Sequence, residues 1–308
     1  MKSKIVVIGS SNVDMIMKVN HIPEVGETLI GGEFNQVFGG KGANQAVSAA
    51  RAGGSVSFIS SVGDDVFTSP MLKNFSNDGI NTKYVFKEAT RPCGTALIMI
   101  GDHGENLITV APGANEMLSP GHLETASRFV KSSEIIILQN EIPDETVEYA
   151  IEMAKANDLK VLWNFAPARE IDKRFLALVD YLVLNEVEAG FLTGMKIDSL
   201  IMAKKAAREL RDSGANTLII TLGSEGSLVF DADRMVHIPA LKVDVIDTTA
   251  AGDVFCGSLA VAITEKKGLE EAVKFATAAS ALSVTKMGAQ PSAPNRKEID
   301  NFINTLKN

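Results

Sequence analysis

Cysteine is scarce in this 308-residue chain, which contains only Cys93 and Cys256. Two cysteines so far apart do not provide the dense disulfide framework of a small secreted protein, and they lack the ligand spacing of a zinc site. We therefore expect both thiols to be buried and to pack as small hydrophobic side chains.

Long apolar runs are also missing. The first run, Ile5–Ile8, is too short for the hydrophobic region of a signal peptide or for a membrane span. No later run reaches the roughly 18 apolar residues that a membrane helix requires. These absences predict a cytoplasmic protein with no membrane partner.

Positive charge is in deficit, with 30 Lys and Arg against 38 Asp and Glu and a net charge of −8. A nucleic-acid surface needs clustered basic residues to neutralise phosphates, so we expect no nucleic-acid partner. The hydrophobic fraction of 45% is ordinary for a globular protein, and a chain of this length can bury a sizeable core in one large domain.

Short apolar runs alternate with amphipathic helical patterns. This alternation predicts an α/β fold with a mostly parallel central sheet, helices on both faces, and ligands beyond the carboxyl ends of the strands. The predicted strands are Ile5–Ile8, Val56–Ser60, Ile135–Leu138, Val161–Asn164, Tyr181–Leu184, Leu218–Thr221 and Ser227–Phe230. The predicted helices are Ala43–Ala52, Glu145–Ala156, Leu200–Arg211, Ala251–Glu265, Glu270–Lys286 and Arg296–Leu306.

Two regions, about 13–38 and 92–111, break this rhythm. Each contains two short alternating segments typical of hairpins, and the two hairpins could pair into a small β-sheet lid over the main domain. The alternative is a peripheral decoration without a role. The segments are Glu27–Ile30 and Phe34–Phe38, then Thr95–Ile100 and Leu107–Ala111 around a turn at Gly101–Gly104.

The segment Asp247–Asp253 places small residues directly before a predicted helix. Small residues let the backbone approach a ligand, and a helix N-terminus offers unpaired N–H groups to a phosphate. Asp253 would then lie within reach of a substrate hydroxyl. The alternative is an acidic residue that stabilises the first turn of a helix.

The segment Gly39–Ala46 is a second glycine-rich entry to a helix, and it carries Lys41 and Asn44. It is not a Walker A loop, because Gly42 follows the lysine where serine or threonine is needed. It also lacks the G-x-G-x-x-G pattern of a dinucleotide site. The alternative is a tight helix entry with a solvated lysine.

Three further segments carry polar residues beside predicted strands. Asn12 and Asp14 follow the first strand, where they suit a polyol or simply form a turn. Asn185 and Glu188 suit a water-mediated Mg²⁺ site or a helix N-cap. The loop Thr221–Gly226 suits a nucleotide or forms an ordinary turn.

With these segments, the chain resembles the PfkB family of carbohydrate kinases over essentially its whole length. The resemblance rests on the glycine-rich segment Gly39–Ala46 and on the D-T-x-x-A-G-D pattern at Asp247–Asp253, in the expected order and separation. It implies a Rossmann-like three-layer core, a small β-sheet lid, and the use of ATP and Mg²⁺.

The resemblance also implies residue roles. Asp253 would be the general base, and the backbone amides of Ala250, Ala251 and Gly252 would form the anion hole. The sugar would contact Asn12, Asp14, Gly40, Lys41, Asn44, Glu141 and Asp253. ATP would contact Asn185, Thr221, Gly223, Ser224, Glu225, Gly226, Gly252 and Thr277, with Mg²⁺ held through water by Glu188. A K⁺ activator would lie beside Asp247, Thr249, Ser283, Lys286, Gly288 and Ser292.

The expected reaction is phosphorylation of the terminal hydroxyl of a pentose, with ribose as the leading acceptor. Deoxyribose, a ketohexose or a nucleoside remain alternatives, as does a non-catalytic sensor with the same fold, whereas a sugar phosphate is disfavoured because it would need extra Arg or Lys near the acceptor. The resemblance further implies a homodimer clasped through the lids. Two departures from the family pattern, Asn140 before Glu141 and the small polar Thr277, bear on fine specificity.

Overall fold

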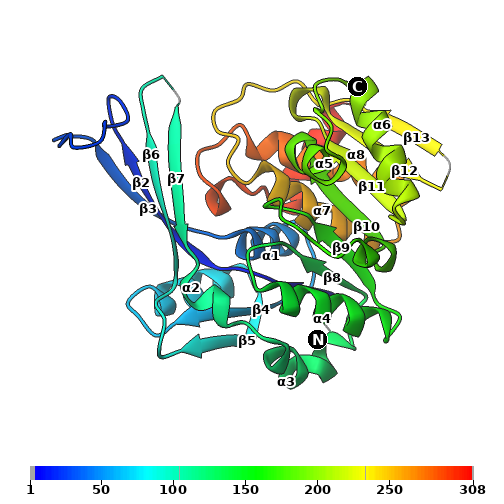
Figure 1. Cartoon of the computed structure of the whole chain (residues 1–308), viewed down its shortest axis with the longest axis horizontal. Coiled ribbons are helices and arrows are strands. Elements are labelled where there is room, and N and C mark those ends of the chain that lie inside the picture. The colour runs from blue at the N-terminus through cyan, green and yellow to red at the C-terminus, as the bar shows by residue number, and fades with distance from the viewer. Residues whose placement is uncertain (1–3, 104, 233, 307–308) are drawn as a thin grey trace.

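Two β-sheets organise the chain (Figure 1). The computed structural model describes residues 4–103, 105–232 and 234–306. Over these residues the larger sheet has nine strands in the order β13-β12-β11-β10-β9-β8-β1-β4-β5, parallel except at β11–β12 and β12–β13. Its strands are β1 (Ile5–Ile8), β4 (Val56–Gly63), β5 (Asn81–Glu88), β8 (Ile135–Leu138), β9 (Lys160–Asn164), β10 (Tyr181–Asn185), β11 (Thr217–Thr221), β12 (Ser227–Asp231) and β13 (Arg234–Ile238).

Helices cover both faces of this sheet, and successive side chains of β1 point alternately to the two faces. Ile5 and Val7 join one buried cluster, with α1 (Lys41–Arg51), α2 (Thr68–Asn77), α7 (Ala251–Thr264), α8 (Leu269–Ser283) and α9 (Arg296–Thr305). Val6 and Ile8 join the other, with α3 (Pro120–Val130), α4 (Asp144–Lys155), α5 (Glu186–Thr193) and α6 (Leu200–Asp212). The predicted three-layer α/β core is therefore confirmed.

All seven predicted core strands are present, and the largest difference is at β4, which continues to Gly63. Short 3₁₀ turns fill some connections: η1 (Gly113–Met117), η2 (Lys173–Leu178), η3 (Gly223–Glu225) and η4 (Gln290–Ser292). Both cysteines are buried, as expected. Among the described residues, no helix has the length and apolar character needed to cross a bilayer.

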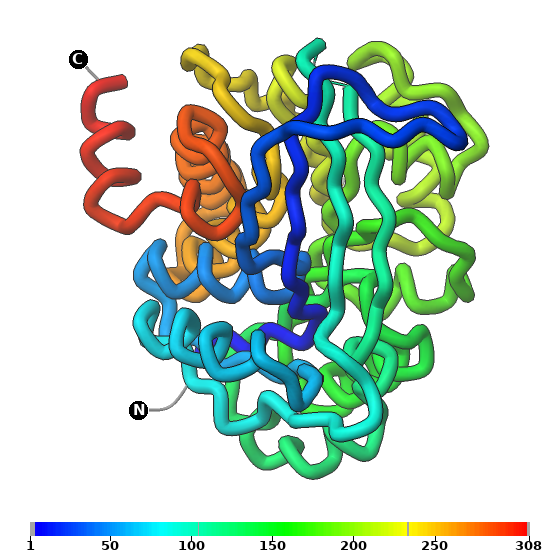
Figure 2. Tube along the Cα trace, turned by 90° about the vertical axis from the view of Figure 1, so that its left-hand side faces the viewer, coloured from blue at the N-terminus to red at the C-terminus, as the bar shows by residue number. Residues whose placement is uncertain are grey.

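The smaller sheet consists of β3 (Glu33–Gly39), β2 (Asn12–Lys18), β6 (Gly94–Ile100) and β7 (Asn106–Ala111), in that order. Strand β2 pairs antiparallel with β3 and parallel with β6. Figure 2 shows the four strands side by side across the face of the molecule turned to the viewer. The two predicted hairpin regions therefore do pair with each other.

Two details of that prediction were wrong. Glu27–Ile30 is not a strand, because Gly26, Gly31 and Gly32 adopt positive φ angles of 90°, 116° and 112° and turn the chain out of extended geometry. The strand that pairs with β3 is instead β2, whose first residues had been expected to form a loop. The predicted turn at Gly101–Gly104 can be followed only to His103, because Gly104 lies outside the described residues.

Helices α1 and α7 cross at very short range. A Cβ atom on Gly257 of α7 would lie 2.6 Å from the carbonyl oxygen of Gln45 in α1. A Cβ atom on Gly42 would lie 2.6 Å from the carbonyl carbon of Gly9, which follows β1. These glycines allow the start of α1 to sit against both β1 and α7, which brings Gly39–Ala46 and Asp247–Asp253 together.

Candidate active site

Asp253 lies in the first turn of α7 and is only 6% exposed. Its Oδ2 accepts a hydrogen bond from Asn44 Nδ2 at 3.0 Å, and its Oδ1 accepts one from Gln45 Nε2 at 2.9 Å. Burial raises the pKa of this carboxyl group, while the charge of Lys41 and the two amide donors oppose that rise. The arrangement is a buried carboxylate held by donors on both oxygens.

The backbone before Asp253 forms the start of α7. Ala250 is the N-cap and has a φ of 60°, which is unusual for a residue with a side chain. The amide of Ala251 donates to the carbonyl of Thr248 at 3.2 Å. Within the described part of the chain, the amides of Ala250 and Gly252 meet no acceptor. Two of the three expected anion-hole amides are therefore free to receive an anion.

Lys41 begins α1 directly after Gly40, which is the N-cap with a φ of 87°. Burial alone would lower the pKa of this lysine, but attraction to Asp253, Glu141 and Glu188 outweighs burial and raises the pKa above its ordinary value. Lys41 therefore stays positively charged among three carboxyl groups.

Glu141, in the loop after β8, caps the start of α1. Its Oε2 accepts hydrogen bonds from the backbone amide of Lys41 at 2.9 Å and from Ser10 Oγ at 2.5 Å. Ser10 Oγ in turn accepts the amide of Gly42 at 3.3 Å. Oε2 of Glu141 is thus engaged by the protein, while no contact within the described chain engages Oε1.

Asn12 and Asp14 lie on strand β2 and not in a loop, so the strand pleat directs both to one face. Asn12 Oδ1 accepts a hydrogen bond from Asn115 Nδ2 at 2.7 Å. The carboxyl group of Asp14 has no hydrogen-bond partner among the described residues, although Asp14 is only 9% exposed. Burial, with repulsion from Glu141 and Asp253, raises its pKa to about 7.

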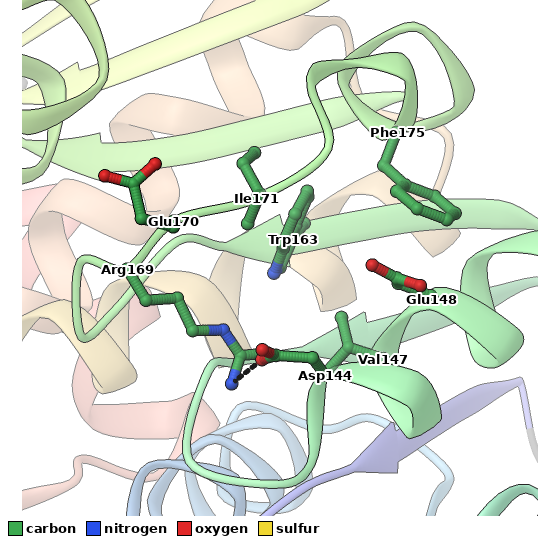
Figure 3. Close-up of a pocket in the computed structure, with 8 residues that line it drawn as sticks. All are labelled: Asp144, Val147, Glu148, Trp163, Arg169, Glu170, Ile171 and Phe175. Carbon is green, nitrogen blue, oxygen red and sulfur yellow. Dashed lines mark ion pairs between the residues drawn. The ribbon is translucent and has the colours of Figure 1, made fainter.

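The loop that carries Glu141 is fastened from behind, in the region drawn in Figure 3. Trp163 Nε1 donates to Asn140 Oδ1 at 2.9 Å, and Asn140 Nδ2 donates to the Pro167 carbonyl at 3.0 Å. The Arg169 guanidinium, paired with Asp144 in Figure 3, donates to the carbonyl groups of Asn140 at 3.3 Å and Ile142 at 3.0 Å. These hydrogen bonds account for a polar residue at position 140, which departs from the family pattern.

Asn185 and Glu188 form a reciprocal capping box at the start of α5, which confirms the helix-cap alternative. Glu188 Oε2 accepts the Asn185 amide at 2.8 Å, and Glu188 Oε1 accepts Asn185 Nδ2 at 3.1 Å. Burial raises the pKa of Glu188. No group of three or more His, Cys, Asp or Glu able to hold a metal occurs among the described residues.

The loop Thr221–Gly226 closes on itself beyond strand β11. The Leu222 amide donates to the Gly226 carbonyl at 2.7 Å, and Thr221 Oγ1 donates to the Leu184 carbonyl at 3.2 Å. Gly223, Ser224 and Glu225 form η3, and Ser224 and Glu225 are exposed. Thr277 lies in α8, where its hydroxyl bonds the carbonyl of Val273 at 2.9 Å. The loop thus follows β11 at the carboxyl end of the sheet, as expected for a ligand site.

Asp247 ties two loops together beside the start of α7. Its Oδ1 accepts Thr249 N at 2.9 Å and Thr249 Oγ1 at 2.6 Å, and its Oδ2 accepts Gly288 N at 2.8 Å. These bonds outweigh partial burial and lower the pKa of Asp247. The other expected cation residues use their side chains elsewhere: Ser283 Oγ bonds Ser280 O, Ser292 Oγ bonds Ala289 O, and Lys286 pairs with Glu298.

The sequence interpretation missed several polar residues that the structure brings to Asp253 and Glu141. Gln45 stands inside the glycine-rich segment but had no assigned role, although it contacts Asp253 directly. Asn164 ends β9 and Gln139 directly follows β8, positions at the carboxyl edge of the sheet that could have marked them. Ser10 was also missed and bonds Glu141, and Asn115 was missed and bonds Asn12.

A family model described as pfkB family carbohydrate kinase matches residues 2–296. A deoxyribokinase of Salmonella typhi is 40% identical over 300 residues, covering 97% of this chain and 98% of the relative. A ribokinase of Haemophilus influenzae is also 40% identical, over 303 residues that cover 98% of this chain and 99% of the relative.

A solved structure supports the same likeness. The structure of Arabidopsis thaliana ribokinase complexed with ribose and ATP superposes with a TM-score of 0.92 at 31% identity, covering 98% of this chain and 99% of that one. Sequence similarity and backbone architecture therefore agree over nearly the whole length.

Proposed function

Because the chain belongs to the pfkB family of carbohydrate kinases, we propose that it transfers the γ-phosphoryl group of ATP to the terminal hydroxyl of a pentose. The acceptor is D-ribose and the product D-ribose 5-phosphate. A ribokinase relative at 40% identity and the likeness to a ribokinase bound to ribose and ATP support this choice.

One observation carries the proposal. The buried Asp253 carboxylate lies at the start of α7, where two backbone amides are free, and it interacts electrostatically with the charged Lys41. Phosphoryl transfer requires mainly positioning and stabilisation of charge on the phosphate oxygens. A base, a set of anion-binding amides and a cation are the protein groups that such a reaction uses.

In the proposed mechanism, Asp253 accepts the proton of the terminal hydroxyl as that oxygen attacks the γ-phosphorus in line. The amides of Ala250 and Gly252 stabilise the phosphate oxygens, and the Ala251 amide joins them by releasing Thr248. Lys41 offsets negative charge at the same place. Each preorganised donor of this kind typically contributes about 10²–10³ in rate.

The donor set near ATP fits a hydrated Mg²⁺ ion. Both oxygens of Glu188 already accept hydrogen bonds from Asn185, so Glu188 would hold the ion through water and not directly. Such an ion neutralises charge on the transferring phosphates. ATP would contact Asn185, the loop Thr221–Gly226, Gly252 and Thr277.

A monovalent cation fits beside Asp247. This carboxylate fastens the loop of Thr249 to that of Gly288 by accepting a backbone amide from each. The side chains of Ser283, Lys286 and Ser292 are engaged elsewhere, so these residues would offer carbonyl oxygens. We therefore retain K⁺ as the activator.

The sugar would bind between β2 and the starts of α1 and α7, in contact with Asn12, Asp14, Gly40, Lys41, Asn44 and Glu141. Two features favour an acceptor rich in hydroxyl groups. Among the described residues, Asn44 Oδ1 is buried without a hydrogen-bond partner, and the carboxyl group of the buried Asp14 also has none. A site built to bond a hydroxyl rejects an analogue that lacks it.

Deoxyribose is the second candidate, because a relative named deoxyribokinase is as similar as the ribokinase. A coupled assay of ADP release over ribose, 2-deoxyribose, hexoses, sugar phosphates and nucleosides separates the acceptors. We expect the highest kcat/KM with ribose. A preference for deoxyribose would replace the acceptor and keep the kinase, whereas no ADP release with any acceptor would favour a sensor.

We further propose one kinase domain in which residues of about 13–38 and 92–111 form a lid. Apolar side chains of the smaller sheet, Leu97, Leu107, Ile108 and Val110, are exposed. Large exposed apolar patches mark interaction surfaces, and these residues suit a homodimer clasped through the lids. Location in the cytoplasm stays a prediction.

A further inference from the structure

Gln45 connects the Asp253 carboxylate to the ends of two core strands. It is fully buried in α1, and its Nε2 donates to Asp253 Oδ1 at 2.9 Å and to Asn164 Oδ1 at 3.0 Å. Its Oε1 accepts a hydrogen bond from Gln139 Nε2 at 2.6 Å. Every polar group of this side chain is thus used, although no sugar or phosphate role requires Gln45.

The partners of Gln45 permit only one orientation of its amide. Turning the amide by 180° would place Oε1 against the oxygens of Asp253 and Asn164 and would point its NH₂ at that of Gln139. Asn164 is itself oriented, because its Nδ2 donates to the Val183 carbonyl at 3.4 Å. In a buried site such mismatches are costly, because the groups involved have no water to bond instead.

The two oxygens of Asp253 consequently have different surroundings. Oδ1 faces the interior network, whereas Oδ2 bonds Asn44, whose own Oδ1 is buried and unpaired among the described residues. Oδ2 is therefore the oxygen on the side of the site residues. A fixed rotation of the carboxylate keeps this oxygen in place.

We propose that Gln45 is a positioning residue that, locked by Gln139 and Asn164, fixes the rotation of the Asp253 carboxylate and keeps it ready to accept a proton. The inference rests on the proposed function, in which Asp253 is the base. Burial and the charge of Glu141 both favour the protonated form of Asp253, and Gln45 is one of the groups that oppose them. A protonated Asp253 could not take the hydroxyl proton.

The test is the pH dependence of kcat in Gln45→Met, which keeps the length of the side chain and removes its polar groups. We expect kcat to fall by about 10- to 100-fold at neutral pH. We also expect the acidic limb of the profile to move to higher pH by about one unit, because a donor to the charged form is lost. Binding of ribose, measured by calorimetry, should change little.

Ser48→Ala is the matched control. Ser48 lies one turn further along α1, is also buried, and also joins α1 to α7, by donating to the Val254 carbonyl at 2.9 Å. Among the described residues, no hydrogen bond joins Ser48 to Asp253. A general loosening of the α1–α7 contact would alter this variant as well, so we expect its acidic limb to stay at the parent position.

Gln139→Met provides a second variant, which leaves Asp253 and Gln45 in place and removes the donor to Gln45 Oε1, so that the Gln45 amide is held by Asp253 and Asn164 alone. We expect a shift in the same direction and of smaller size. The proposal is overturned if kcat of Gln45→Met falls without movement of the acidic limb, or if neither variant differs from the parent. Should Gln45→Met fail to fold, the Gln139 variant decides alone. A parent enzyme without kinase activity would instead count against the proposed function.

Discussion

Glu141 Oε2 accepts the backbone amide of Lys41 at 2.9 Å, although the two residues are 100 positions apart in the chain. The bond satisfies an amide at the start of α1 and places a negative charge at the positive end of that helix. The residue expected to contact the sugar therefore also holds the glycine-rich segment in place.

Replacement of Glu141 should accordingly affect both binding and stability. In Glu141→Ala, we expect the KM for ribose to rise and the free energy of unfolding to fall by about 1 kcal/mol, the usual effect of losing a cap. Denaturant titration and steady-state kinetics measure the two effects. Glu124→Ala, an exposed residue of α3, is the control and should leave both unchanged. Unaltered stability in Glu141→Ala would contradict the capping role.

Asp253→Asn should separate catalysis from binding. We expect kcat to fall by about 10²–10⁴, since a positioned base is lost, while the Kd for ribose stays within a few-fold of the parent value. Rapid-quench turnover and calorimetry test this directly. Turnover within about three-fold of the parent enzyme would remove Asp253 from the role of base.

Asp14 should make the sugar-free protein less stable as pH rises. Its pKa of about 7 in the folded protein exceeds the ordinary value of 3.8 for an aspartate, so the folded state binds more protons between these pH values. Stability contributed by the neutral carboxyl group is complete below about pH 4 and declines until about pH 7.

Asp14→Asn removes this dependence. As the pH rises from 5 to 8, the free energy of unfolding of the parent should fall by on the order of 3 kcal/mol relative to that of the variant. The variant should also bind ribose more weakly. Urea titrations at both pH values supply the measurement. A stability difference that does not grow with pH would show that Asp14 ionises normally.

Trp163 should affect the acceptor site through Asn140. Trp163→Phe removes the donor to Asn140 Oδ1 and loosens the loop of Glu141, so we expect a several-fold higher KM for ribose with little change in kcat. A double-mutant cycle with Asn140→Leu tests the connection. Additive effects would indicate independent roles. Because Trp163 is the only tryptophan, folding is best followed by circular dichroism.

Potassium should activate the enzyme through Asp247. In a Tris buffer without K⁺, we expect low activity that rises when K⁺ is added, and a much weaker response in Asp247→Asn, because asparagine has one acceptor oxygen and cannot hold the amides of both Thr249 and Gly288. The exposed Asp244→Asn serves as the control and should respond as the parent does. A parent enzyme indifferent to K⁺ would remove Asp247 and its neighbours from this role.

The core could be predicted from the sequence because its strands are local apolar runs. Ile5–Ile8 and Ile135–Leu138 have the predicted bounds, because each is a continuous run of aliphatic residues that favours a buried strand. The start of β2 was predicted wrongly, because its local composition and its observed structure disagree. The residues Gly9–Asp14 have turn composition, and pairing of β2 with β3 and β6 overrides that preference.

The candidate site divides in the same way. Gly39–Ala46 and Asp247–Asp253 are contiguous motifs, so their meaning is visible in the sequence. Gln45 was overlooked because its role depends on Asp253, which is 208 positions away, and on Gln139 and Asn164 at the ends of separate strands. A buried amide acquires a function only from partners that the fold supplies.

Only Gly9–Ser11 separate β1 of the main sheet from β2 of the smaller one. Because this connection is short, the orientation of the smaller sheet determines where Asn12 and Asp14 lie relative to the main sheet. A sugar that contacts both Asp14 and Asp253 would therefore connect the smaller sheet to the main domain. The position of the smaller sheet and the binding of the acceptor should therefore depend on each other.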